Sequence, residues 1–309
     1  METVMDTCIT VWHWPTQERW FDEGIRTSLD LVRHAGFTHI NWNPDAGSSY
    51  WMADAEIEFT RRIVAEAGLK VHSVHSTNGR NTVSELIGPV PFTFESRKDI
   101  RSPHEWQRLS GVELLKNRID LAAAFGAPNI VLHVDISDDV FRSPESETEF
   151  FAPLYRSLDE LLPYCLERKV QIAAETLLNA SGGSFLKLYE RLFSRYEPAF
   201  IGLCYDSGHW ELLEPGGLTV LERYGNRLIA THIHDNFGAK DNHLLPFDGR
   251  LDWNAITKAI AATDYVTPLN FETPMDRYGV PDAVFYHRAH AVAARLEGMI
   301  ATARRKVGE

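Results

Sequence analysis

The stretch Ile201-Gly-Leu-Cys-Tyr-Asp206-Ser-Gly-His209-Trp210 has the pattern of a buried strand that ends in polar side chains. Its apolar run is short and unbroken, which is typical of a strand covered on both faces. Asp206 and His209 follow where the chain turns away, so both are candidates for a site at the carboxyl end of this strand. Asp and His also cap helices and satisfy buried backbone groups, and this stretch alone leaves both interpretations open.

Several other apolar runs also end in a carboxylate or an imidazole. They are Val131-Leu-His133, Ile172-Ala-Ala-Glu175, Ile229-Ala-Thr-His232-Ile-His234-Asp235 and Leu269-Asn-Phe-Glu272. Short runs of this kind alternate with longer segments of helical period, which predicts an α/β protein built from βα units around a parallel sheet. Eight units can be counted, and no Gly-rich phosphate-binding sequence follows an early strand. A closed (β/α)8 TIM barrel is therefore favoured over an open sheet.

The eight predicted units account for nearly the whole chain, and we expect residues 1–309 to form a single barrel domain. The predicted strands are 7–12, 38–42, 70–76, 129–135, 170–176, a strand ending at 206, 228–234 and 266–272. The predicted helices are 21–34, 53–67, 106–125, 151–168, 184–193, 218–224, one from a cap at Asp252 through 262, and 282–304. The Gly- and Pro-containing segment 77–105 predicts a long irregular loop, either a lid over the site or a surface excursion. The acidic segment 136–149 predicts an exposed loop.

Composition limits the classes of partner. The chain has 309 residues, 44% of them apolar, and a formal net charge of −12 from 31 basic and 43 acidic residues. Because nucleic-acid affinity comes largely from Lys and Arg on phosphates, a nucleic acid is not the expected partner. Cys8, Cys165 and Cys204 lack paired spacing and are expected to be buried and unpaired. No membrane span or leader pattern is visible, so we expect a soluble cytoplasmic protein, with homo-oligomer formation left open.

Glu175, Asp206, His232 and Glu272 end the predicted strands five to eight and should converge at one end of the barrel. Three carboxylates that lie close together repel one another, and a divalent cation is the natural compensation. Carboxylate oxygens suit Mn²⁺, Mg²⁺ and Co²⁺, while the imidazole also allows Zn²⁺ and Fe²⁺. We expect a metal site here, with Mn²⁺ as the first candidate.

The order and spacing of these residues resembles that of the xylose isomerase-like barrel superfamily. The residues that carry the resemblance are His75, His133, Glu175, Asp206 with His209, His232 in His-Ile-His-Asp, Asp241-Asn-His243, and Glu272 in Glu-Thr-Pro. The superfamily includes sugar-phosphate isomerases and epimerases, ketose 3-epimerases, inosose dehydratases and endonuclease IV. The resemblance covers almost the whole chain and is most specific in strands five to eight.

The ketose-epimerase branch implies one metal held by Glu175, Asp206, His232 and Glu272. The resemblance implies that the two glutamates act as acid and base and that His209 binds a substrate oxygen. A metal on a carbonyl and its neighbouring hydroxyl acidifies the C–H between them and stabilises an enediolate. Return of the proton to the opposite face gives epimerisation, and return to the neighbouring carbon gives isomerisation. A dehydratase or other lyase would begin with the same proton removal.

The endonuclease branch implies three zinc ions and remains an alternative. Its matching positions are His75, His133 and Glu175 for one ion, Glu175, Asp206, His232 and Glu272 for a second, and His209, Asp241 and His243 for the third. Two features disfavour a phosphodiester hydrolase that acts on DNA. The chain is acidic overall, and residues 43–58 contain four acidic and no basic residues to bind phosphates. His75 and His133 have the alternative of binding a substrate hydroxyl or orienting a glutamate. Asp241 and His243 have the alternative of binding substrate.

The remaining candidates concern the substrate. Trp12 and Trp14 end the first predicted strand and either pack on a sugar ring or belong to the core. Arg277 either meets a phosphate or lies in solvent. His72 and His234 are interpreted as structural, and because His72 and His75 differ in parity, only one of them is expected to face the barrel interior. We expect a metal-dependent isomerase or epimerase of an unphosphorylated keto-sugar or polyol-derived ketone, with an inactive sugar-binding barrel as a third hypothesis.

Overall fold

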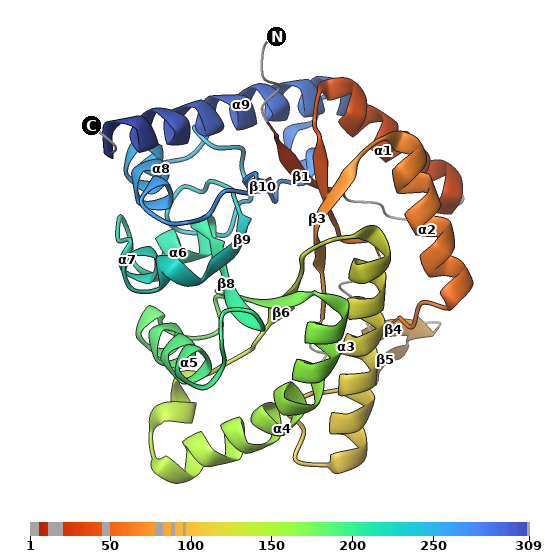
Figure 1. The fold of residues 1–309 in the computed structure, drawn as a ribbon, viewed down its shortest axis with the longest axis vertical. Coiled ribbons are helices and arrows are strands. Elements are labelled where there is room, and N and C mark those ends of the chain that lie inside the picture. The colour runs from red at the N-terminus through yellow and green to blue at the C-terminus, as the bar shows by residue number, and fades with distance from the viewer. Residues whose placement is uncertain are drawn as a thin grey trace.

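A parallel sheet of eight strands forms the centre of the molecule (Figure 1). The computed structural model describes residues 6–11, 21–44, 50–77, 83–87, 90–94 and 97–307. Within these residues the strands follow one another in the order β10-β1-β2-β3-β6-β7-β8-β9. The strands are β1 (Cys8–Val11), β2 (His39–Trp42), β3 (Lys70–His75), β6 (Asn129–His133), β7 (Gln171–Glu175), β8 (Ile201–Asp206), β9 (Leu228–His232) and β10 (Asn270–Phe271).

The first and last strands of this order meet just beyond the end of β9, which nearly closes the barrel. The Ile233 amide donates to the carbonyl of Asn270 at 2.8 Å, and the Glu272 amide donates to the carbonyl of Ile233 at 3.1 Å. The predicted TIM barrel is confirmed. The last strand is shorter than the predicted 266–272, because Val266 is 82% exposed and Pro268 has no amide to donate to a neighbouring strand.

Helices follow the strands and surround the barrel (Figure 1). The helices are α1 (Phe21–Ala35), α2 (Asp54–Ala67), α3 (Glu105–Phe125), α4 (Pro144–Arg168), α5 (Gly182–Arg195), α6 (Ser207–Leu213), α7 (Thr219–Tyr224), α8 (Trp253–Ala261) and α9 (Asp282–Val307), with the short 3₁₀ helices η1 (Asp138–Phe141), η2 (Gly225–Arg227) and η3 (Met275–Tyr278). Gly68 and Gly126 directly follow α2 and α3 and end them in the left-handed conformation. No helix in the described part of the chain combines the length and apolarity needed to cross a bilayer.

Two segments differ from the predicted loops. The segment 77–105 contains an antiparallel hairpin of β4 (Val83–Ile87) and β5 (Val90–Phe94), in which Val83 pairs with Phe94. The prolines of this segment interrupt its strand pattern, so the sequence did not predict the hairpin. A two-stranded hairpin tolerates proline, because each strand has one edge without a hydrogen-bonded neighbour. The segment 136–149 is largely helical, because Ser143 caps α4 by accepting from the Ser146 amide at 3.2 Å and Pro144 occupies the first turn.

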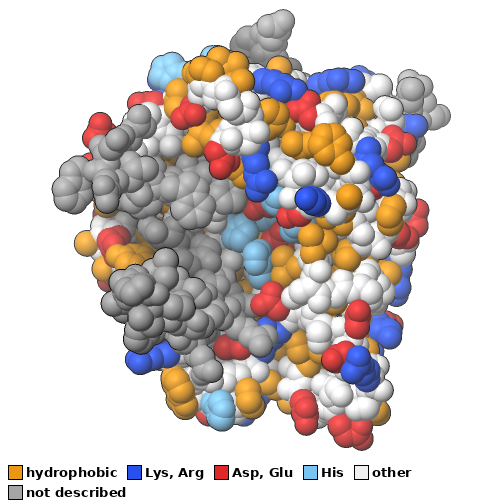
Figure 2. All heavy atoms as spheres, turned by 180° about the vertical axis from the view of Figure 1, so that it is seen from behind, with side chains coloured by type: hydrophobic (Ala, Val, Ile, Leu, Met, Phe, Trp, Pro, Cys, Tyr) orange, Lys and Arg blue, Asp and Glu red, His pale blue; other side chains and the backbone are white. Residues whose placement is uncertain are grey.

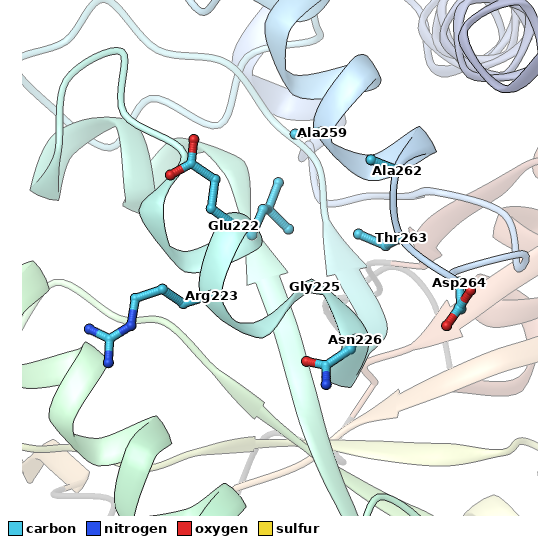
Figure 3. Close-up of a pocket in the computed structure, with 9 residues that line it drawn as sticks. Glu222, Arg223, Gly225, Asn226, Ala259, Ala262, Thr263 and Asp264 are labelled. Atoms are coloured by element: carbon cyan, nitrogen blue, oxygen red, sulfur yellow. The ribbon is translucent and has the colours of Figure 1, made fainter. Parts of the chain in front are cut away.

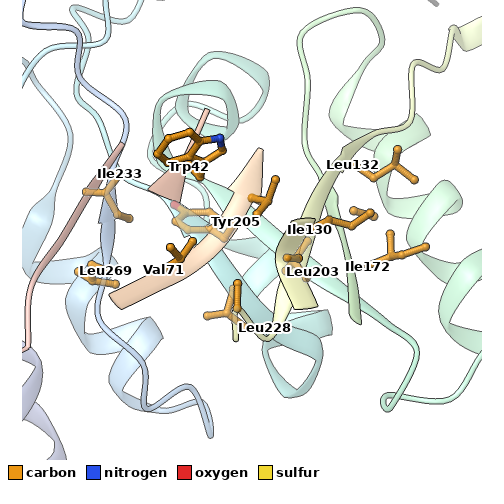
Figure 4. Close-up of a cluster of buried hydrophobic side chains, with 14 of the residues drawn as sticks. Trp42, Val71, Ile130, Leu132, Ile172, Leu203, Tyr205, Leu228, Ile233 and Leu269 are labelled. Carbon is orange, nitrogen blue, oxygen red and sulfur yellow. The ribbon is translucent and has the colours of Figure 1, made fainter. Parts of the chain in front are cut away.

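The strands bury apolar side chains on both faces. Side chains that point outward pack under the helices and include Trp42, Ile130, Ile172 and Leu203 (Figure 4). Val131, Ala173, Cys204 and Ala230 form a separate small cluster between the strands. Since side chains alternate along a strand, these four small residues occupy the inward face. The polar residues two positions further along share that face.

Candidate metal centre

The inward face of four neighbouring strands changes from small apolar residues to acids and imidazoles at its carboxyl end. The pairs two residues apart are Val131 and His133, Ala173 and Glu175, Cys204 and Asp206, and Ala230 and His232. Glu272 follows β10 directly, and the bond from its amide to Ile233 places it beside the end of β9. The strands therefore deliver these side chains to one end of the barrel, where sites of such barrels are built.

Glu175, Asp206, His232 and Glu272 form the first group. Each offers one donor atom, and these four atoms all lie within 4.8 Å of one another. His232 Nδ1 lies 2.8 Å from Glu175 Oε1 and 3.1 Å from Glu272 Oε2. Three of the four side chains come from the ends of adjacent strands. The structure thus brings together all four of the predicted metal ligands.

The charges of this first group fit a divalent cation. All four residues are at most 4% exposed. Burial raises the pKa of Glu272, but His232 outweighs it and lowers that pKa to about 2. Burial likewise raises the pKa of Glu175, which His232 and His133 bring well below the ordinary value. Buried carboxylates that stay ionised need positive charge nearby. The neighbouring histidines supply it here, and a divalent cation would supply it through direct bonds to the carboxylate oxygens.

His75 and His133 extend the first group on one side. His133 Nε2 lies 2.9 Å from Glu175 Oε2, and His75 Nε2 lies 3.7 Å from Glu272 Oε1. His75, His133 and Glu175 also have three donor atoms within 4.8 Å of one another. His72 lies elsewhere, with its Nε2 3.2 Å from the hydroxyl of Tyr265. Of the two histidines on β3, the one that reaches the centre is His75.

A second group consists of His209, His234, Asp241 and His243, again with donor atoms within 4.8 Å of one another. Asp241 Oδ2 lies 2.9 Å from His243 Nε2 and 3.3 Å from His209 Nε2. His234 is fully buried, and its ring stacks on that of His243 at 3.9 Å between centroids. We interpreted His234 as structural, whereas the structure makes it a member of this group. His234 lies two residues after His232, and this i, i+2 spacing is the sequence signal from which its place in the site could have been predicted.

Hydrogen bonds within the second group keep its carboxylate ionised. Burial raises the pKa of Asp241, but the bonds from His209 and His243 bring it well below the ordinary value. Burial lowers the pKa of His209, whereas Asp206 and Asp241 raise it to about 10. Burial also lowers the pKa of His243, and Asp241 and Glu272 raise it to about 9. Asp241 therefore lies between two strongly basic imidazoles, those of His209 and His243.

The predicted substrate contacts are only partly placed. Trp12 and Trp14 lie outside the described residues. Arg277 lies on η3, just after β10, and is exposed. His209 turns its Nε2 toward Asp241, so this nitrogen already has a partner. His133 keeps 34% of its side chain exposed. Figure 2, the view from behind, shows histidine and carboxylate side chains close together near the middle of that face. His133 therefore exposes part of the centre to solvent.

A cavity of about 360 Å³ lies at the opposite end of the barrel (Figure 3). Residues of α7, η2 and the end of α8 line it, among them Arg223, Asn226 and Thr263. η2 directly precedes β9, so the cavity lies beside the amino ends of the strands. This end of a TIM barrel contributes to stability, and reacting groups come from the other end.

The fold and the two groups define a TIM barrel with a carboxylate and histidine centre at the carboxyl ends of its strands. The profile of the xylose isomerase-like TIM barrel family matches residues 29–300, and the chain belongs to this family. Uncharacterized protein y4fM of Sinorhizobium fredii (strain NGR234) is 73% identical over 306 residues, which cover 98% of each chain.

Solved structures share the fold at low sequence identity. An L-ribulose 3-epimerase superposes with a TM-score of 0.70 and 17% identity, over 98% of this chain and 97% of its own. The IolI protein with a bound zinc atom superposes with a TM-score of 0.66 and 14% identity, over 94% and 98% of the two chains. D-allulose 3-epimerase from Methylomonas sp., in complex with D-allulose, gives a TM-score of 0.64 and 17% identity, over 96% of each chain.

Proposed function

We propose that this protein is a divalent-metal-dependent isomerase or epimerase of a keto-sugar. The observation that carries the proposal is the first group, in which two glutamates contact the same nitrogen of His232 within a buried set of four donors. Sugar epimerases and a zinc-containing protein among the structural neighbours support it. We also propose that residues 1–309 act as one barrel domain.

In this proposal Glu175, Asp206, His232 and Glu272 hold one metal ion, with Mn²⁺ as the first candidate. When bound, the ion would polarise the carbonyl of the sugar and favour negative charge on its oxygen. Burial of the four side chains excludes water from this part of the centre. Each carboxylate then interacts more strongly with its neighbours than it would in solvent.

Glu175 and Glu272 would move the proton. Glu175 ends β7 and Glu272 follows β10, with β8 and β9 between them around the barrel, so a sugar bound between the two carboxylates would present one face to each. One carboxylate oxygen takes the proton from the carbon next to the carbonyl, and the other carboxyl group returns one. His75 and His133 border both glutamates and are placed to bind a substrate hydroxyl. Trp12, Trp14 and Arg277 remain proposed substrate contacts.

Exchange with solvent deuterium tests this function. Protein loaded with Mn²⁺ is incubated in D₂O with a panel of free ketopentoses and ketohexoses, and each sugar is analysed by NMR. We expect deuterium at the carbon beside the carbonyl of at least one sugar, together with a new stereoisomer or an aldose. Glu272→Gln should abolish the exchange, and Glu222→Gln, which lies at the opposite end of the barrel, should not. A folded, metal-loaded protein that exchanges no sugar of the panel would contradict the proposal.

A phosphodiester hydrolase is the second candidate, because the structure brings together all nine residues that a three-metal centre would use. Its distinguishing prediction is metal-dependent nicking of a duplex with an abasic site. The net charge of −12 disfavours a nucleic-acid substrate. A dehydratase would use the first group and lose water, which the same NMR experiment detects as a product without the β-hydroxyl.

A further inference from the structure

Asp206, one of the four residues proposed to hold the metal ion, is also contacted by a buried imidazole from outside the first group. The Nε2 atom of His234 lies 2.9 Å from Asp206 Oδ1 and 3.1 Å from Asp206 Oδ2. We propose that His234 is a positioning residue, which fixes the orientation of the Asp206 carboxylate and thereby the affinity of the first group for its metal ion. This inference rests on the proposed function, in which Asp206 is a ligand of that ion.

His234 supplies the side-chain hydrogen bond to Asp206, and a backbone amide supplies another. The amide of His209 donates to Asp206 Oδ1 at 2.7 Å. The ring of His209 is also near, with its Nδ1 3.2 Å from Oδ2, but this nitrogen donates to the carbonyl of Thr176 at 2.8 Å. Hydrogen bonds weaken when their angles change, so rotation of the carboxylate would weaken its bonds to His234 and to the amide. These two donors therefore fix its plane.

The carboxylate that His234 contacts also belongs to the first group. Asp206 offers a donor atom within 4.8 Å of the donor atoms of the other three members. The chain from His232 to His234 is extended, because Ile233 and Asp235 each form a β-bridge, and residues two apart in an extended segment point to the same side. One of the two histidines therefore enters the first group, and the other contacts a carboxylate of that group from the next position along the chain.

The residues that directly follow Asp206 fix the position of His234. Ser207 Oγ donates to the His234 carbonyl at 2.7 Å and accepts from the His234 amide at 3.0 Å. Gly208 leaves room for the ring, because a Cβ atom at this position would lie 2.0 Å from His234 Cε1. The ring also stacks on that of His243, with 3.9 Å between the centroids. The imidazole is therefore held with its Nε2 toward Asp206.

Burial makes the contact between His234 and Asp206 energetically important. Both side chains are fully buried. A buried carboxylate interacts more strongly with its neighbours than one in solvent, and a buried polar group without a partner costs stability. Side chains that bind metals are commonly oriented by hydrogen bonds from outside the ligand set, and loss of such a bond typically weakens metal binding about 10–100-fold. We expect an effect of this size from the loss of the His234 imidazole.

Titration of metal-free protein with Mn²⁺ tests this proposal, with the unbound ion measured by electron paramagnetic resonance. His234→Leu should weaken binding about 10–100-fold, because its side chain cannot donate to Asp206. His234→Gln should bind Mn²⁺ nearly as tightly as the wild type, because the amide nitrogen of glutamine can take the place of Nε2. His234→Asn should be as weak as His234→Leu, since its shorter amide corresponds to Nδ1, and it replaces the leucine variant if that variant does not fold.

Two control variants separate this role from general effects. His72→Leu removes another buried imidazole, whose Nε2 lies 3.2 Å from the Tyr265 hydroxyl. Asp241→Asn removes the carboxylate of the second group and leaves the contact between His234 and Asp206 in place. Both controls should bind Mn²⁺ like the wild type. Circular dichroism of every variant establishes that it is folded.

The outcomes are distinct. Wild-type affinity in folded His234→Leu, or in the asparagine variant that replaces it, would overturn the inference. Weak binding by His234→Gln would also overturn it, because a restored hydrogen bond would then not restore affinity. Equal weakening in either control would assign the effect to a cause other than the bond to Asp206. If the wild type exchanges deuterium into a sugar while His234→Leu binds Mn²⁺ normally, this inference alone fails. If the affinities follow the expected order and no sugar exchanges deuterium, the proposed function alone fails. A wild type that binds no Mn²⁺ would refute both.

Discussion

Asp235 is the anchor of the loop that carries Asp241 and His243, and its replacement should destabilise the protein by an amount that can be worked out from its contacts. The side chain is fully buried, and its two oxygens accept two hydrogen bonds each. Oδ1 accepts from the amides of Asn236 at 2.8 Å and Leu251 at 3.1 Å. Oδ2 accepts from the Phe247 amide at 3.0 Å and the Trp253 indole at 2.8 Å.

Asp235→Ala leaves four buried donors without their acceptor. At about 1 kcal/mol for each, the lower end for a buried unsatisfied group, the free energy of unfolding should fall by at least about 4 kcal/mol. Asp235→Asn should lose about half of that, because the amide nitrogen faces two donors whichever way the group is turned. Asp252→Ala is the matched control. Asp252 is exposed and caps α8 by accepting from two amides, so its loss should cost about 1 kcal/mol.

The assay is urea unfolding of the three variants and the wild type, followed by tryptophan fluorescence and circular dichroism. We expect the order Asp235→Ala, Asp235→Asn, Asp252→Ala, from most to least destabilised. The reasoning is refuted if Asp235→Ala costs no more than Asp252→Ala. It is also refuted if Asp235→Asn is as stable as the wild type. In that case the loss of one oxygen that accepts two hydrogen bonds would have no energetic effect.

Three further perturbations test other parts of the account. Glu272→Gln should reduce deuterium exchange at least about 100-fold, as expected for loss of an acid or base, and a smaller effect would remove it from the proton path. Burial lowers the pKa of His72 to about 3, so below pH 6.5 the unfolded chain binds a proton that the folded chain excludes. Stability should fall by about 2 kcal/mol between pH 6.5 and 4.5 through this group, and urea unfolding of His72→Gln at both pH values should show a correspondingly smaller fall. A methyl group at Gly208 would lie 2.0 Å from His234 Cε1, so Gly208→Ala should lower the free energy of unfolding in urea by about 1–3 kcal/mol, whereas an unchanged free energy would place His234 wrongly.

Regular periodicity made most of the barrel predictable. Buried strands such as Ile201–Asp206 and helices that end at Gly68 and Gly126 carry their signals locally. The hairpin within 77–105 was missed because Pro89 and Pro91 interrupt the strand pattern, and pairing between two neighbouring segments restores it. The last strand was predicted too long because its apolar composition does not reveal which residues find a partner in the barrel.

The first group was predictable because each of its residues directly ends a strand, and the barrel brings strand ends together. The second group depends on a loop whose path the sequence does not specify. His234 in particular lies beyond the end of β9, and only the folded loop places Asp241 next to it. The hydrogen bonds from His209 and His243 to the carbonyls of Thr176 and Glu272 are likewise products of tertiary structure.

Anomalous diffraction from crystals grown with Mn²⁺ tests the central claim most directly. The account predicts a manganese peak bounded by Glu175, Asp206, His232 and Glu272, with donor atoms at roughly 2.0–2.3 Å from the ion. Absence of a peak between these four side chains in crystals saturated with the metal would contradict it.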